Sequence, residues 1–203
     1  VEMWPGVAEA VELIGSYQIQ GRATIGGNLC NASPAADSVP ALMAAGARLA
    51  IAGTGGIKEV KIEELYSGPG KVILERDEFV TAVVLPIPRG RTGDAYLRFI
   101  PRTEMDIAVV GAGASLTLDS DERCTQIRLA LGAVAPTARL VNEVQDIIVG
   151  KKLSEQILKD IATAACKVCQ PIDDKRGTIK FRTKVAGVMS GRVVKIAWSR
   201  ARG

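Results

Sequence analysis

The sequence predicts an α+β fold in which an antiparallel sheet packs against helices. Strand-like stretches joined by tight turns recur between residues 95 and 134, and such turns join antiparallel neighbours. Helical patterns fill residues 154–170 and the segment from Thr178 or later to Trp198. The 203 residues, 47% hydrophobic and 24% charged, are enough for one large or two small domains with a substantial core.

Two helices are expected before the first strand. Residues 7–14 place apolar side chains around acidic positions, as an amphipathic helix does. A second helix follows a glycine-rich segment, with Asp37 or Ser38 as its cap and Gly46 at its end. Its apolar sequence indicates that it is buried.

Strand patterns follow these helices. Residues 48–52 and 58–62 are expected to form a hairpin across the glycine-rich turn between them. Residues 65–71 are expected to be a loop, and residues 79–86 a strand. Proline and glycine at positions 86–93 then indicate a domain boundary. The prediction is a first domain at residues 1–90 and a second at residues 94–203.

The second domain is expected to begin with a meander of strands at residues 95–100, 107–118 and 126–134. A helix near residues 139–149 would precede the two C-terminal helices. Residues 111–116 (GAGASL) begin like a dinucleotide-binding fingerprint, but the sixth position is leucine and the strand pattern continues. We therefore interpret this stretch as a strand that packs closely against a neighbouring element.

Composition excludes several classes of function. A net charge of +4 is too small to indicate nucleic-acid binding, and no apolar stretch approaches the ~18 residues of a membrane span. We expect a cytoplasmic protein. The sequence has no histidine, which excludes histidine-based triads and metal sites. The function must therefore rest on a cofactor, on carboxylates or on binding.

The cysteines do not indicate a metal site or a disulfide framework. Cys166 and Cys169 have C-x-x-C spacing, but they lie on an expected helix. Iron–sulfur or zinc binding needs further ligands, and Cys30 and Cys124 are distant in the sequence. We expect no metal in this chain.

The most informative segment is the run ATIGGNLCNASPAAD at residues 23–37. Its two adjacent glycines let backbone N–H groups approach a ligand closely, and such turns can bind phosphates. Asp37 offers an acceptor for a sugar hydroxyl or a ring N–H. By composition alone, an ordinary surface loop is the alternative.

The whole run resembles the second flavin-binding loop of the medium subunits of molybdenum hydroxylases, the family of carbon monoxide dehydrogenase and xanthine dehydrogenase. The resemblance extends over nearly the whole chain. It is carried by residues 8–10, 14–19, 77–80, 98–99, 105–111, 131–137 and 171–174.

The resemblance implies the C-terminal part of a two-lobed FAD-binding domain, followed by the sheet-and-helix domain. Family members carry an earlier loop of the Ala-Gly-Gly-Thr type, and nothing similar precedes Gly15 here. We therefore expect a chain that begins inside the flavin domain, which leaves open whether it retains FAD.

The resemblance also assigns the cofactor-binding residues. The pyrophosphate would be bound by backbone and side-chain donors of Thr24, Ile25, Gly26, Gly27 and Asn28.

Six further residues would lie near the ribityl chain or the ring. Ser33 and Asp37 would face them, and Ile14 and Gly15 match positions that pack near the cofactor, although a helix end with a glycine stop would explain that pair equally well.

Val80 matches a position that touches the isoalloxazine; the alternative is a plain buried strand valine. Arg98 matches a basic position that would stabilise negative charge on the reduced ring; the alternative is a solvated edge-strand arginine. Arg102, Glu104 and Asp106 are expected to form salt links between the domains. No residue is assigned as catalytic.

The implied function is electron transfer within a heteromeric oxidoreductase. A large partner subunit would carry the molybdenum cofactor, and a small one the 2Fe-2S clusters. FAD in this chain would pass electrons from the clusters to an acceptor such as NAD, quinone or oxygen. Two alternatives stay open: a stand-alone FAD oxidoreductase, and a non-catalytic docking or scaffold remnant that no longer binds flavin.

Overall fold

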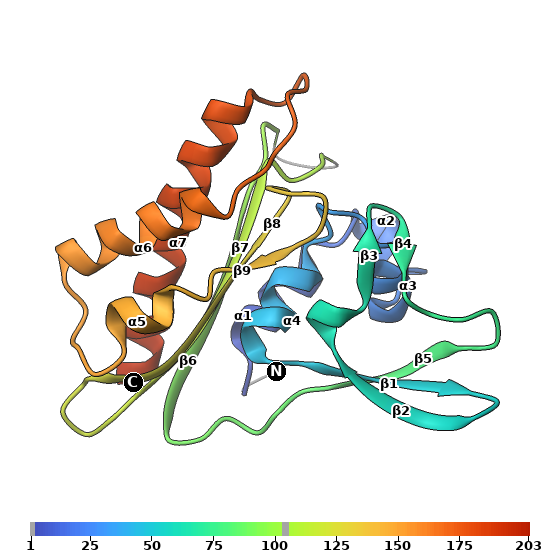
Figure 1. Ribbon diagram of the computed structural model, residues 1–203, viewed down its shortest axis with the longest axis horizontal. Coiled ribbons are helices and arrows are strands. Elements are labelled where there is room, and N and C mark those ends of the chain that lie inside the picture. The colour runs from blue at the N-terminus through green and yellow to red at the C-terminus, as the bar shows by residue number, and fades with distance from the viewer. Residues whose placement is uncertain (1–2, 103–105) are drawn as a thin grey trace.

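A four-stranded antiparallel sheet with helices on both faces forms the centre of the structure, a computed structural model that describes residues 3–102 and 106–203 (Figure 1). Its strands lie in the order β6-β7-β8-β9, so sequential strands are neighbours and the predicted meander is confirmed. The strands are β6 (Arg91–Phe99), β7 (Val110–Leu118), β8 (Cys124–Gly132) and β9 (Arg139–Leu140).

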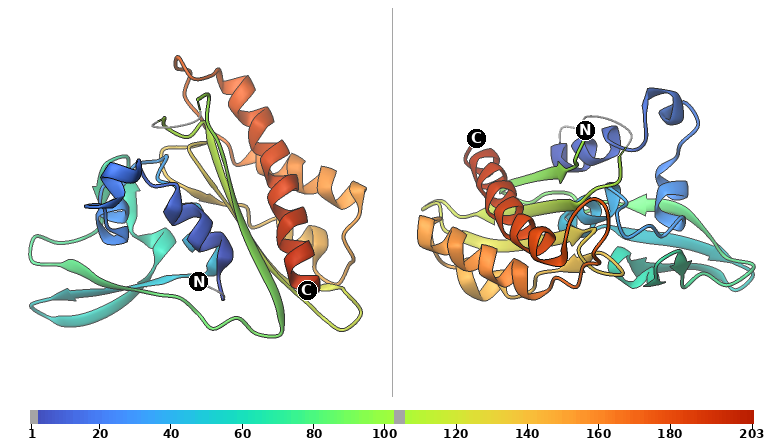
Figure 2. Two further views of the ribbon diagram at one scale, coloured as in Figure 1. Left: turned by 180° about the vertical axis from the view of Figure 1, so that it is seen from behind. Right: turned by 90° about the horizontal axis from the view of Figure 1, so that it is seen from above.

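Two layers of helices enclose this sheet, as the views from behind and above show (Figure 2). One face is covered by α7 and α6, with α5 beside them, and the opposite face by α1 and α4. The helices are α1 (Pro5–Glu12), α4 (Ser38–Ala45), α5 (Val144–Ile148), α6 (Glu155–Lys167) and α7 (Ile179–Arg202). The predicted α+β fold is therefore confirmed.

A second, smaller sheet lies beyond α4, with strand order β2-β1-β5. It is formed by β1 (Arg48–Gly53), β2 (Gly56–Lys61) and β5 (Phe79–Val84), and the predicted hairpin is confirmed by the antiparallel pairing of β1 with β2. The remaining elements are α2 (Tyr17–Gln20), α3 (Ile25–Cys30), η1 (Ile62–Glu64), β3 (Tyr66–Gly68) and β4 (Lys71–Val72).

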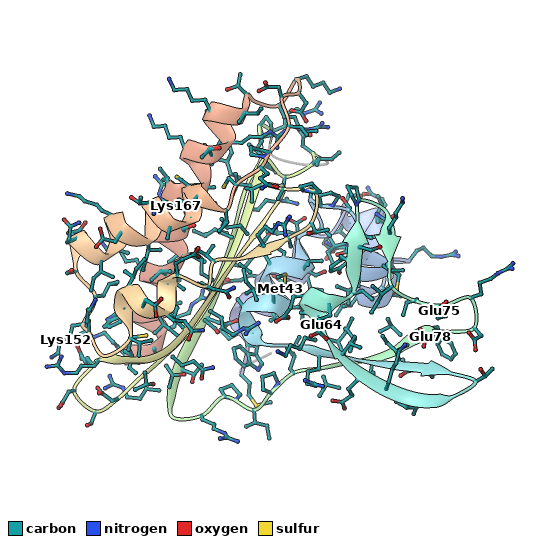
Figure 3. All side chains as sticks on the ribbon, viewed as in Figure 1. Met43, Glu64, Glu75, Glu78, Lys152 and Lys167 are labelled. Atoms are coloured by element: carbon teal, nitrogen blue, oxygen red, sulfur yellow. The ribbon has the colours of Figure 1, made fainter. Side chains whose placement is uncertain are left out.

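The interior of this N-terminal part lies around α4. Met43 is 1% exposed and lies between the four-stranded sheet and η1, as Figure 3 shows. Lys152 and Lys167, by contrast, lie on the outer side of the layer formed by α5 and α6. Apolar burial around α4 therefore joins the N-terminal elements to the inner face of the sheet.

Two local predictions are wrong. Residues 65–71 are not a loop throughout, because they contain β3, which pairs with β4. The helix expected near residues 139–149 is limited to α5, because Arg139 and Leu140 pair with Leu131 and Ala130 of β8. In both places, backbone pairing to a neighbouring strand overrides the local pattern.

The helix ends follow the capping signals in the sequence. The Ser154 and Thr178 hydroxyls accept hydrogen bonds from the backbone N–H groups of Ile157 and Phe181, at 3.2 Å each, and so start α6 and α7. Gly46 ends α4 with a left-handed backbone (φ +72°). None of the helices within residues 3–102 and 106–203 is long and apolar enough to cross a membrane.

The interpretation of residues 111–116 as a closely packed strand is confirmed. They belong to β7, and a Cβ at Gly113 would lie 2.6 Å from the carbonyl oxygen of Pro40 in α4. Two residues further along the strand, the Ser115 hydroxyl donates to the Ala44 carbonyl at 2.6 Å. Small residues on this face of β7 therefore let α4 lie directly on the sheet.

Asp94 predicts a pH dependence of stability where α1 packs on β6. Burial raises the pKa of this carboxyl to about 6, although hydrogen bonds from the backbone N–H groups of Gly6 and Val7 and the charge of Arg200 lower it in part. The folded protein thus keeps a proton that the unfolded chain releases near pH 4. The free energy of unfolding should therefore fall as the pH rises from about 4 to about 6.

Urea unfolding across this range checks the prediction, with Asp94→Asn as the comparison. The variant cannot titrate at this position, so its stability should fall less steeply with pH than that of the wild-type chain. Identical slopes for the two proteins would contradict the assignment to Asp94.

Candidate functional site

The glycine-rich run does not fold as an open loop. Residues 25–30 form α3, and Thr24 is its N-cap, with its hydroxyl accepting a hydrogen bond from the Gly27 N–H at 2.9 Å. Leu29 is fully buried and anchors the short helix to the core. Composition alone predicted a loop, but the Thr24 cap and the burial of Leu29 overcome the low helix propensity of two glycines.

The start of α3 presents bare backbone at the surface. Thr24 and Gly27 are exposed, and a Cβ added at Gly26 would have no other atom within 4 Å. A ligand group can therefore reach the backbone here, while cofactor binding by Thr24, Ile25, Gly26 and Gly27 stays a prediction. Asn28 is used differently, because its Oδ1 accepts a hydrogen bond from the Ser38 hydroxyl at 2.6 Å. This bond ties α3 to α4.

The sequence predicted Asp37 or Ser38 as the cap of α4, but the Asp37 side chain makes no capping hydrogen bond. Its Oδ1 instead accepts a hydrogen bond from the Tyr96 hydroxyl at 2.7 Å, and its Oδ2 pairs with Arg98 Nη1 at 3.0 Å. Asp37 is 9% exposed. Burial raises the pKa of Asp37 above its usual value, while the Tyr96 hydrogen bond and the Arg98 charge lower it in part. Both carboxylate oxygens are therefore bound by β6.

Arg98 is not a solvated edge-strand arginine. Its side chain is 12% exposed, and Nη1 donates both to Asp37 and to the Leu13 carbonyl at 2.9 Å. Leu13 directly precedes Ile14 and Gly15, the other pair expected near the flavin. We call Asp37, Tyr96, Arg98 and the Leu13 carbonyl the Asp37 cluster. It brings three segments, distant in the sequence, to one place.

The turn at Ile14 and Gly15 follows α1. Gly15 has a left-handed backbone (φ +66°), and a Cβ there would lie 2.7 Å from Cγ2 of Ile19. The Ile14 carbonyl accepts a hydrogen bond from Gln20 Nε2 at 3.2 Å. This is the helix end with a glycine stop that the sequence allowed, and Arg98 holds it beside Asp37.

Ser33 and Val80 lie apart from the Asp37 cluster. The Ser33 hydroxyl accepts from the Ala35 N–H at 3.3 Å, and Ser33 lines a mainly apolar cavity of about 390 Å³ together with Pro34 and Pro171. Val80 is half-buried in β5, opposite Ile51, and β5 packs against α3. Val80 therefore belongs to the strand that packs against α3.

The charged cluster is not an inter-domain link. Asp106 pairs with Arg102 at 3.2 Å and with Arg176 at 2.8 Å, and all three residues follow position 94. Glu104, the third member expected, lies outside the described residues. Within those residues, the ion pairs that join the two parts are instead Asp37 with Arg98, Glu63 with Arg128, and Glu9 with Arg200.

Two features beside the site were not predicted from the sequence: the role of Tyr96 and the backbone of two alanines. Tyr96 is two residues before Arg98 on the same face of β6, but nothing in its local pattern distinguishes it from a core aromatic. Ala32 and Ala133 have left-handed backbones (φ +50° and +63°), which is unusual for alanine. The Ala133 N–H donates to the Pro34 carbonyl at 2.7 Å, so these strained positions flank the contact between the glycine-rich run and the sheet.

Comparison with known proteins matches two family models to this chain. Residues 1–88 match the FAD binding domain in molybdopterin dehydrogenase, and residues 95–197 match the CO dehydrogenase flavoprotein C-terminal domain. The xanthine dehydrogenase FAD-binding subunit of Escherichia coli O157:H7 is 32% identical over 200 residues, which cover 98% of this chain and 68% of the relative. The carbon monoxide dehydrogenase medium chain of Hydrogenophaga pseudoflava is 31% identical and covers 97% and 68% respectively.

Solved structures agree. Carbon monoxide dehydrogenase from Hydrogenophaga pseudoflava superposes with a TM-score of 0.91 at 30% identity, over 97% of this chain and 68% of that one. Quinoline 2-oxidoreductase from Pseudomonas putida 86 gives 0.88 at 28% identity, over 100% and 70%. This chain therefore belongs to the family of FAD-binding medium subunits of the molybdenum hydroxylases.

Proposed function

We propose that this chain binds FAD between the start of α3 and the Asp37 cluster and relays electrons within an oxidoreductase complex. The observation that carries the proposal is the Asp37 cluster, in which Arg98 bonds to Asp37 and to the Leu13 carbonyl. It joins three segments that the family resemblance assigns to the flavin. These hydrogen bonds thus hold together the end of α1, the glycine-rich run and β6.

The residues at the start of α3 fit a phosphate group. Gly26 has no other atom within 4 Å of an added Cβ, so the pyrophosphate can approach the main chain. Thr24, Ile25 and Asn28 would bind it through uncharged donors, and Gly27, whose N–H donates to the Thr24 hydroxyl, would leave room for it. Ser33, Asp37, Val80, Ile14 and Gly15 would contact the ribityl chain or the ring. Arg98 would lie beside the ring and hold Asp37 and the Ile14–Gly15 turn in place.

When bound, FAD supplies a carrier that accepts electrons singly and delivers them in pairs. We propose that the electrons come from 2Fe-2S clusters on a small partner subunit, which receive them from the molybdenum site of a large one. An external acceptor such as NAD, quinone or oxygen would take them. Relatives named as medium chains of dehydrogenases support these partners.

The division into residues 1–90 and 94–203 belongs to the same proposal. The two family models match on either side of it, over residues 1–88 and 95–197. The cytoplasmic location stays a prediction.

Titration of the purified chain with FAD, followed by flavin absorbance, tests the proposal. Saturable uptake is expected, either by this chain or after the upstream glycine-rich segment of a relative has been joined to it. No uptake in either form would overturn the proposal and favour the docking remnant.

Gly26→Ala separates the site from the fold. The new methyl group meets no other atom, and alanine favours a helix over glycine, so the free energy of unfolding should stay equal or rise by up to about 1 kcal/mol. The FAD dissociation constant should nevertheless rise about tenfold, because the methyl group occupies the space that the pyrophosphate needs. Gly55→Ala, also without a neighbour within 4 Å but outside the proposed site, is the matched control. Equal FAD affinities in both variants would contradict the placement at α3.

A further inference from the structure

Tyr96 lies between the two parts of the molecule. Its side chain extends from β6 towards α4, it is 4% exposed, and its hydroxyl donates to Asp37 Oδ1 at 2.7 Å. The cluster of buried apolar residues around α4 includes Tyr96 with Leu42 and Met43. Burial and the adjacent Asp37 carboxylate hold the pKa of Tyr96 well above its usual value, so the hydroxyl remains a hydrogen-bond donor.

The sheet is shaped to admit this hydroxyl. Tyr96 pairs with Gly113 and Arg98 pairs with Gly111 on the neighbouring strand β7. A Cβ at Gly111 would lie 2.6 Å from the Tyr96 hydroxyl oxygen. Only glycine at position 111 therefore leaves room for the hydroxyl in its present place, which indicates that a defined position of this group matters.

The hydroxyl completes the coordination of Asp37. Tyr96 binds Oδ1 and Arg98 binds Oδ2, and Arg98 also bonds to the Leu13 carbonyl. Without the hydroxyl, Oδ1 would lose this donor in a position that water hardly reaches, since Asp37 is 9% exposed. The carboxylate would then turn to recover a donor, and Arg98 would follow it away from Leu13.

We propose that Tyr96 is a positioning residue of the flavin site, which acts through Asp37 and Arg98 to fix the Ile14–Gly15 turn and the end of the glycine-rich run. The inference rests on the proposed function. Tyr96 itself does not touch the cofactor in this scheme; it sets the orientation of the groups that do. Flavin affinity and flavin potential should therefore depend on one buried hydroxyl group.

Tyr96→Phe tests the inference, in whichever form of the chain takes up FAD in the titration above. Removal of a hydrogen bond to a charged group should raise the FAD dissociation constant about tenfold. The midpoint potential of the bound flavin should become more negative, because an Asp37 carboxylate with one donor fewer presents more negative charge to the reduced ring. Gly111→Ala, which keeps the hydroxyl but displaces it, should change both quantities in the same direction.

Tyr66→Phe is the matched control. The Tyr66 hydroxyl is also buried, but among the described residues it has no hydrogen-bond partner. Its removal should leave FAD affinity and potential at wild-type values.

A purely structural role for Tyr96 would lower the unfolding temperature of Tyr96→Phe without a change in potential, and this result would overturn the inference. Equal affinities and potentials in wild type, Tyr96→Phe and Tyr66→Phe would also overturn it while leaving the proposed function intact. No FAD uptake by the wild-type chain in either form would overturn both.

Discussion

Replacement of Arg98 by methionine is expected to destabilise the chain and to abolish FAD retention. The Asp37–Arg98 pair is 3.0 Å long, and the two side chains are 11% and 12% exposed. Loss of the arginine leaves a buried carboxylate without its counter-charge, which costs about 3 kcal/mol or more of unfolding free energy. The same change releases the Leu13 carbonyl and with it the turn at Ile14 and Gly15. Denaturant unfolding and FAD titration of the variant measure the two effects.

Two comparisons isolate the buried charge as the cause. Arg48→Met removes an arginine from an exposed pair with Glu59, at 2.9 Å, and should cost less than about 1 kcal/mol. Adding Asp37→Asn to Arg98→Met removes the unpaired charge and should restore part of the stability. An Arg98 variant no less stable than the Arg48 variant would show that the pair contributes little.

Gly113→Ala is expected to have an effect of similar size by separating α4 from the sheet. The added Cβ would lie 2.6 Å from the carbonyl oxygen of Pro40 and 2.9 Å from Cα of Ala41. These are backbone atoms and cannot rotate away, so α4 must shift, at a cost of about 3 kcal/mol. Because Asp37 directly precedes α4, the shift should also weaken the Asp37 cluster and FAD binding.

Thermal unfolding and FAD titration measure this second effect. Gly55→Ala is again the control, since its Cβ meets no atom within 4 Å. A Gly113 variant as stable as the control would mean that α4 can move away from β7 without loss. Full stability combined with weaker FAD binding would instead confine the effect of Gly113 to the site.

Local signals were sufficient for most of the secondary structure. Ser154, Thr178 and Gly46 set helix ends through bonds and backbone angles within a few residues, so the sequence predicts them well. The hairpin of β1 and β2 and the meander of β6 to β8 follow from tight turns, which are also local. The short strands β3, β4 and β9 were missed because pairing with a neighbour creates them, not their own pattern.

The candidate site divides in the same way. The glycine-rich run is evident from the sequence, because adjacent glycines among Thr24 and Asn28 are a local and unusual arrangement. The family resemblance then assigns Asp37 and Arg98 to the flavin. That these two side chains bind each other could not be read from the sequence, since 61 positions separate them.

The sequence alone thus determined the α+β class, the main helices and strands, and the segments that belong to the flavin-binding family. Only the tertiary structure decided that α4 lies on glycines of β7, that Asp37 turns inward instead of capping its helix, and that the Tyr96 hydroxyl bonds to it. The physical reason is that a carboxylate takes the strongest donors within reach. Which donors are within reach depends on how the chain packs and not on its neighbours in the sequence.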